Sequence, residues 1–322
     1  MPDQPDHDSP WKDILERFFI DFVEFFFPDV HAGIDWEKEY TFMDKELQQL
    51  VRDSEIGRRL ADKLVRVHTR DGAPLMVLTH IEVQGAYERD FAERIYVYNY
   101  RIYDKFRCPV VSLAVLTDES LTWRPASFGY KRWGFRLEME FPMIKLLDYN
   151  DVATLENDPN PFAIVVIAHL KTLETRHTPR ERFAWKWHLT MALYKRGYNK
   201  QDVIHLFLFI DWIMTLPEEL KKSFSQRIMD YEEDRKMRYI SSVEEYCMEK
   251  GMEQGMEKGM LAEAREMVAE VLSTRFSPIP EKIVKAISTI EDRKVLKELV
   301  KKAVLTRSLE QFESEFKNYG NC

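Results

Sequence analysis

Hydrophobic positions near the N-terminus follow helical spacing. A run of apolar side chains recurs at intervals of four, four and three residues, at Ile14, Phe18, Phe22 and Phe25. This periodicity predicts a helix over 11–27 that begins after Ser9-Pro10 and stops at Pro28. A second, shorter helix is predicted over 43–51, where Leu47 and Leu50 supply the apolar positions.

The pattern then changes to that of strands. Two mostly apolar runs, 60–69 and 75–84, flank Asp71-Gly72, a tight-turn signal, and together predict a β-hairpin. A helix over 88–105 and a buried strand over 110–117 follow. Two further short strands are predicted, at 127–130 and 134–142.

From about residue 161 the pattern is helical almost throughout. The apolar run at 162–168 also fits a buried strand by period alone, but we predict a helix there. The predicted helices are 161–175, 180–196, 200–215, 217–237, 240–273, 281–288, 291–305 and 308–317. The chain is therefore expected to contain a disordered start (1–10), an α/β domain (11–150), a helical region (151–240) and a helical tail (241–322).

The tail contains a short repeat. Three Met-Glu-x-Gly units start at Met248, Met252 and Met256. A period of four advances 400° around a helix, so methionine and glycine form two slowly spiralling stripes. Each glycine costs about 1 kcal/mol relative to alanine, so close packing against another chain would have to stabilise the helix. We therefore predict a homo-oligomer formed through residues 240–273; the alternative is a solvent-exposed helical tail.

Composition fits a globular protein with no membrane span. Hydrophobic residues make up 45% of the 322 residues and charged residues 32%, which is enough for a packed core. No apolar run approaches the roughly 18 residues of a membrane span. The N-terminus is acidic, unlike a secretory signal. The three widely spaced cysteines exclude a disulfide framework and suit a reducing compartment, so we expect a cytoplasmic protein.

Charge is unevenly distributed. The net charge is −8, but residues 1–50 alone carry 13 acidic against 4 basic side chains, whereas residues 51–150 carry 14 against 16. The overall acidity therefore belongs to the first 50 residues. Charge alone neither indicates nor excludes a nucleic-acid partner for the middle of the chain.

The predicted hairpin carries the candidate chemistry. Asp62 lies on its first strand, and His80, Glu82 and Gln84 share one face of the second, because strand side chains alternate. A carboxylate in a mostly apolar strand is costly to bury unless it is paired or binds a metal. Asp62 and Glu82 together would offer oxygen ligands of the kind that Mg²⁺ or Mn²⁺ prefers.

Simpler interpretations remain open. Asp62, Glu82 and Gln84 would also fit a buried polar cluster bonded to Arg94, and His80 on a sheet face is more often structural than a ligand. The chain contains neither a P-loop nor a Gly-x-Ser-x-Gly motif, which removes support for an NTPase or an α/β-hydrolase.

Four segments resemble a known family. They are Ala61-Asp62-Lys63-Leu64, His80-Ile-Glu-Val-Gln-Gly85, Phe91-Ala-Glu-Arg94 and Tyr98-Asn-Tyr-Arg101. Their amino-acid sequences are similar to those of the bacterial Rpn (YhgA-like), transposase-like branch of the PD-(D/E)XK nuclease superfamily. The predicted order of helix, hairpin, helix and strand matches the αββαβ core of that superfamily, and the Met-Glu-x-Gly tail resembles the tails of these proteins.

The resemblance implies an α/β fold and a Mg²⁺- or Mn²⁺-dependent DNA endonuclease that serves recombination or transposition. Asp62 and Glu82 would hold the metal, and Gln84 would orient water at the position where the superfamily usually has lysine. Glu46 is the candidate for an additional acid. Two arginines on one helix face, Arg94 and Arg101, would hold phosphate.

The glutamine is a departure from the superfamily's pattern, because it cannot supply the positive charge of lysine. The competing hypothesis is therefore a non-catalytic nuclease-fold protein that binds DNA or a protein partner.

Overall fold

The computed structural model describes residues 10–44, 46–47, 63–82, 90–276, 278–288, 290 and 292–316. Contacts divide the chain into two compact units, Met1–Ser241 and Ser242–Cys322. The chain is 62% helical and contains a mixed five-stranded sheet, which confirms the α/β class. The disorder predicted for residues 1–10 is not tested over 1–9, which lie outside the described residues, and Pro10 is the first residue of a helix.

The N-terminal segment forms three helices, so the prediction of one continuous helix over 11–27 was wrong. The helices are α1 (Pro10–Arg17), α2 (Phe19–Phe26) and α3 (Pro28–Gly33). The backbone of Phe18 leaves the helical region, with φ −123° and ψ 39°. The predicted stop at Pro28 is confirmed, since α2 ends at Phe26. Pro28 then begins α3, because proline is well tolerated at the first helical position.

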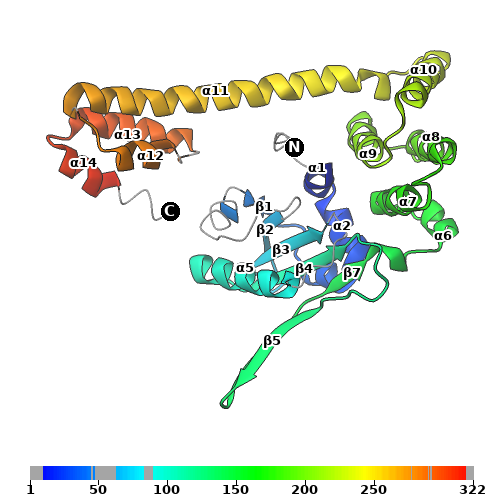
Figure 1. Ribbon diagram of the computed structural model, residues 1–322, viewed down its shortest axis with the longest axis horizontal. Helices are drawn as coiled ribbons and strands as arrows, with labels where there is room; N and C mark the ends of the chain where they lie inside the picture. Colours follow the sequence, from blue (N-terminus) through cyan, green and yellow to red (C-terminus); the bar gives the residue numbers. More distant parts are fainter. Residues whose placement is uncertain are drawn as a thin grey trace. The chain divides into compact units, whose positions relative to one another are not determined.

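The five-stranded sheet has the order β1-β2-β3-β4-β7 (Figure 1). Its strands are β1 (Thr41–Phe42), β2 (Lys63–His68), β3 (Pro74–Glu82), β4 (Val110–Leu116) and β7 (Met143–Lys145). β2 and β3 form the predicted antiparallel hairpin, in which Lys63 pairs with Thr79. The turn contains Gly72 at φ +86°, a conformation that favours glycine. β3, β4 and β7 run parallel.

Helix α5 (Phe91–Phe106) connects β3 to β4, as the sequence predicts for 88–105. Parallel neighbouring strands require such a crossover. One buried cluster of side chains places Tyr98 and Ile102 of α5 against Leu64 of β2 and Met76 of β3. The observed order of hairpin, helix and parallel strand is therefore the one expected from the sequence.

A second, two-stranded sheet is formed by β5 (Ser127–Arg132) and β6 (Phe135–Glu140). It confirms the two short strands predicted between residues 127 and 142. In Figure 1 this hairpin projects away from the five-stranded sheet. Pro142 separates it from β7, which returns the chain to the edge of the main sheet beside β4.

Five helices complete the first unit: α6 (Val152–Asn157), α7 (Pro161–Glu174), α8 (Pro179–Lys195), α9 (Lys200–Ile213) and α10 (Glu218–Asp234). The apolar run at 162–168 is helical and fully buried within α7. Asn160 caps this helix by accepting a hydrogen bond from the Phe162 backbone N–H at 2.9 Å, and Pro161 follows the cap. Trp11 of α1 packs edge-on against Phe209 of α9, with ring centroids 4.9 Å apart.

The second unit consists of α11 (Val243–Phe276), α12 (Glu281–Ser288), α13 (Arg293–Leu305) and α14 (Leu309–Phe316), close to the predicted ranges. Val268 and Leu272 of α11 are buried against the three shorter helices. Met252 and Met256, in the repeat, remain 73% and 69% exposed. Among the described residues, no helix combines the length and apolar composition needed to cross a lipid bilayer.

Candidate functional site

The backbone of one predicted metal ligand, Glu82, lies at the edge of the sheet where the parallel strands end. Glu82 is the last residue of β3, and its backbone pairs with Leu116 of β4, which in turn pairs with Lys145 of β7. Asp62, Gln84 and the side chain of Glu82 lie outside the described residues, so the carboxylate pair stays a prediction. Among the residues that are described, no three His, Cys, Asp or Glu side chains form a group able to hold a metal ion.

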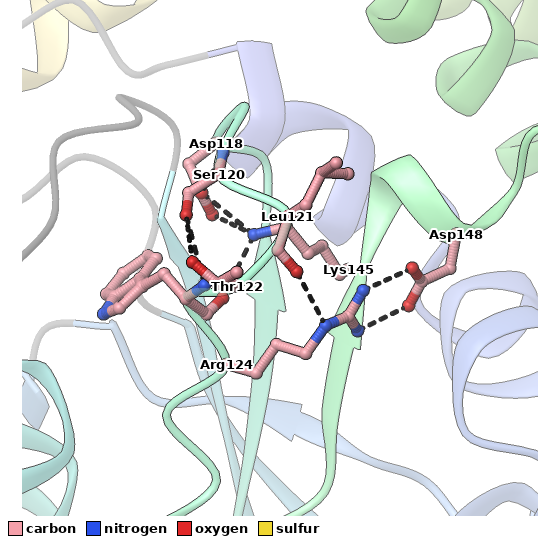
Figure 2. A network of polar contacts seen from close by, with 8 residues as sticks. Asp118, Ser120, Leu121, Thr122, Arg124, Lys145 and Asp148 are labelled. Carbon is pink, nitrogen blue, oxygen red and sulfur yellow. Dashed lines mark hydrogen bonds and ion pairs between the residues drawn. The ribbon is translucent and has the colours of Figure 1, made fainter.

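This edge is the usual position for a ligand site in an open α/β sheet, because loops at the carboxyl ends of parallel strands leave a crevice between them. The loop after β4 and the end of β7 both lie here. Figure 2 shows the polar network that these two segments build.

A buried ion pair forms the centre of the network. The Lys145 ammonium donates to both carboxylate oxygens of Asp118, at 2.9 and 2.8 Å, and to the Trp123 carbonyl at 3.1 Å. The two charged side chains are 0% and 1% exposed. Two fully desolvated charges are tolerated only when each has its hydrogen-bonding capacity filled, and here three acceptor atoms surround one ammonium group.

The loop that follows β4 is fixed by further contacts (Figure 2). Asp118 also accepts a hydrogen bond from the Ser120 backbone N–H at 2.8 Å, and the Ser120 hydroxyl accepts one from the Trp123 backbone N–H at 3.1 Å. Arg124 holds Asp148 through two hydrogen bonds of 2.7 and 2.6 Å. The hydrogen bonds with Arg124 lower the pKa of Asp148. These contacts connect the loop to β7 and to the residues that follow it.

A neutral histidine lies beneath the same loop. His169 of α7 is buried, and burial lowers its pKa to about 4. A hydrogen bond to the Thr117 backbone and the nearby carboxylates of Glu119 and Asp118 act in the opposite direction but do not offset the burial. Its Nε2 atom has no hydrogen-bond partner among the described residues. His169 is therefore uncharged at neutral pH.

Arg94, a predicted phosphate ligand, belongs to the same end of the fold. Its guanidinium lies over the Phe91 ring at 5.3 Å, and Phe91 packs edge-on against Trp123 at 5.4 Å. Trp123 is the residue whose carbonyl accepts from Lys145. These contacts connect the start of α5 to the loop after β4.

Arg101 lies elsewhere. It is seven residues further along α5, which is about 10 Å at 1.5 Å per residue. Asn99, two residues before it, donates to the Val110 carbonyl at the first residue of β4, the opposite end of that strand from Leu116. The structure thus brings Arg94, but not Arg101, to the edge that contains Glu82.

Lys63 directly follows Asp62 and is buried at the start of β2. Its ammonium forms ion pairs with Glu16 of α1, at 3.0 Å, and with Asp44. Burial disfavours the charged amine, but the two carboxylates outweigh this effect and raise the pKa of Lys63. Glu46, the predicted additional acid, is half-buried in the short helical segment that also contains Asp44. Of the two acids in this segment, Asp44 is the one that pairs with Lys63 of β2.

No family model, curated protein or solved structure matches the chain.

Sequence reasoning missed the Asp118–Lys145 pair. The two residues are 27 positions apart, and neither belongs to a recognisable motif. One signal was present in the sequence: Asp118 directly follows the predicted strand 110–117, where a charged residue must be solvated or paired. Lys145 had no such signal, because β7 was not predicted.

Proposed function

We propose that the protein is a Mg²⁺- or Mn²⁺-dependent endonuclease that hydrolyses DNA phosphodiester bonds in a recombination or transposase-like reaction. The observation that supports this most is the backbone position of Glu82. It ends β3, the strand that pairs with both the hairpin partner β2 and the parallel strand β4. Ligands of open α/β sheets bind at the carboxyl ends of the parallel strands, and the Glu82 backbone lies at this end.

The proposed donor set has the right chemistry for such a metal. Asp62 and Glu82 provide carboxylate oxygens and Gln84 an amide oxygen, and hard divalent cations prefer oxygen ligands. A metal bound there would lower the pKa of a water molecule and neutralise charge on the phosphodiester. Gln84 would orient the attacking water through its amide. Arg94 would hold a phosphate oxygen, since guanidinium groups bind phosphate through paired hydrogen bonds.

A second function is favoured by two features of the sequence and of the described residues. Gln84 stands where a lysine is usual, and Lys63 is already engaged by Glu16 and Asp44. A non-catalytic nuclease-fold protein that binds DNA or a protein partner would also have these features. Divalent-metal binding separates the two functions, because an active nuclease requires it at this site.

The test is cleavage of supercoiled plasmid by the purified protein with Mg²⁺ or Mn²⁺. Asp62→Ala and Glu82→Ala should each abolish nicking, since one carboxylate cannot balance the metal's charge alone. Glu219→Ala, which removes an exposed acid of α10, is the matched control and should cut like the parent. Nicking that persists in both site variants would refute the endonuclease. The absence of both cleavage and calorimetric Mn²⁺ binding would support the non-catalytic alternative.

A further inference from the structure

The tip of the β5–β6 hairpin concentrates aromatic and cationic side chains. Trp133 and Gly134 form its two-residue turn, and the Trp133 side chain is 99% exposed. Two more large aromatic residues near the tip, Tyr130 and Phe135, are 50% and 54% exposed. Residues 130–137 also contain three cations and no acid, in a chain whose net charge is −8. The three cations are Lys131, Arg132 and Arg136.

Trp133 does not contribute to the stability of the fold. Its backbone has φ +47°, and Gly134 follows at φ +87°. Turns with two positive φ angles favour Asn-Gly or Asp-Gly, because most side chains are strained in this conformation. With its ring almost completely in solvent, Trp133 gains no burial energy that offsets the strain. The indole is thus fully available to a partner.

The two faces of the hairpin differ in character. One face is aromatic. Phe128 stacks on Tyr96 of α5, with ring centroids 5.0 Å apart. Tyr130 contacts Phe128 at 6.3 Å and Phe135 at 5.6 Å. On the other face, Lys131 pairs directly with Arg136 across the strands. Like charges in directly opposed positions repel. Glu138 forms an ion pair with Arg136 and leaves Lys131 without a carboxylate partner in the described structure. A bound anion at the tip would relieve this repulsion.

We propose that the hairpin tip binds an unpaired nucleic-acid strand, with the Trp133 indole stacked on a base and Lys131 and Arg132 against the flanking phosphates. Proteins that hold single strands combine these two features, because every base offers a π face and every nucleotide a negative charge. A stacked duplex hides the base faces, so the exposed indole favours single strands. This inference is independent of the proposed hydrolysis, since binding needs no metal.

The test measures binding of a fluorescein-labelled single-stranded oligonucleotide by fluorescence anisotropy, with EDTA present so that cleavage cannot interfere. The decisive variant is Trp133→Asn. Asparagine tolerates positive φ before Gly134, so the turn is preserved while the ring is lost. Losing one base–aromatic stack should raise Kd by about 5- to 150-fold. Trp133→Phe, which keeps a ring, should bind nearly as tightly as the parent.

The predicted contacts of Lys131 and Arg132 with the phosphates are tested separately. The double variant Lys131→Ala/Arg132→Ala should reduce the slope of log Kd against log salt by about 1.4, for two phosphate contacts to a single strand. Lys222→Ala, which removes an exposed cation of α10, is the matched control and should leave the slope unchanged. The parent should also prefer the single strand to a duplex of the same sequence.

Two outcomes would overturn the proposal. If Trp133→Asn binds the oligonucleotide as tightly as the parent, the indole does not stack on a base. If Trp133→Asn and Lys131→Ala/Arg132→Ala both leave single-strand binding unchanged, the tip does not contact nucleic acid at all, and its apolar face would have to serve a protein partner instead. Circular dichroism of each variant establishes that the hairpin and the rest of the fold are retained.

Discussion

Replacing Lys145 by methionine should destabilise the Met1–Ser241 unit by about 3–5 kcal/mol, the usual cost of removing one partner from a buried ion pair. Lys145 and Asp118 are 0% and 1% exposed, so water cannot replace the lost ammonium group. The substitution leaves the Asp118 carboxylate without its cation and removes the Lys145 hydrogen bond to the Trp123 carbonyl. Methionine fills most of the space, which keeps the cavity term small.

The assay is urea unfolding followed by tryptophan fluorescence. All seven tryptophans precede residue 242, so the signal reports the unit that contains the ion pair and not the C-terminal helices. The midpoint should fall while the dependence of the unfolding free energy on urea concentration stays the same. Arg124→Met is the matched control: it breaks an ion pair in the same loop whose two partners are exposed, and its effect should be much smaller.

A double variant shows whether the charges are coupled. Asp118→Asn keeps an acceptor for the Ser120 backbone N–H, and its combination with Lys145→Met removes both charges. The double variant should be less destabilised than the sum of the two single variants, because no uncompensated charge remains. Strict additivity, or a loss below about 1 kcal/mol for Lys145→Met alone, would refute the reasoning.

Three further outcomes are expected. His169 has its ordinary pKa near 6.5 in the unfolded chain and a pKa of about 4 in the folded one, so the unfolded chain binds its proton more readily; its contribution to the free energy of unfolding is therefore present above pH 6.5 and is lost as the pH falls. Between pH 7.5 and 5 this loss should be about 2 kcal/mol. His169→Gln should flatten that part of the curve of unfolding free energy against pH. If Gln84 orients the attacking water, Gln84→Ala should lower the rate of plasmid nicking by about 10²-fold and Gln84→Lys should retain or raise it, so unchanged rates in both would make Gln84 structural. Nothing lies within 4 Å of a Cβ added at Gly255 or Gly259, so replacing both glycines by glutamine should leave α11 intact. If the repeat mediates self-association, the variant should have a lower mass by light scattering than the parent. An unchanged mass would contradict that role.

The structure limits which side of the C-terminal helix α11 could mediate the predicted self-association. The repeat and its helical period predict a helix and a partner-binding surface over 240–273, and α11 confirms the helix. Val268 and Leu272, within that range, are covered by α12–α14 of the same chain. The side of α11 that carries Val268 and Leu272 is therefore not available for self-association, whereas Met252 and Met256 of the repeat are exposed.

Local patterns determined most of the secondary structure. The hairpin, α5, β4 and the helices of the second half follow from side-chain periodicity and turn residues, because these signals act over a few neighbouring positions. The break at Phe18 could not be read in the same way. The apolar spacing continues across it, so the periodicity of the side chains carries no sign of the change in backbone angles at Phe18.

Tertiary structure decided which charged residues meet. The sequence singled out acids and arginines by their spacing, but pairs such as Asp118–Lys145 and Lys63–Glu16 join residues 27 and 47 positions apart. Such contacts depend on strand order and on the path of loops, which short-range patterns do not encode. The separation of Arg94 from Arg101 also depends on tertiary structure. Both residues share one helix face in the sequence, but α5 runs antiparallel to β4, so they lie at opposite ends of that strand.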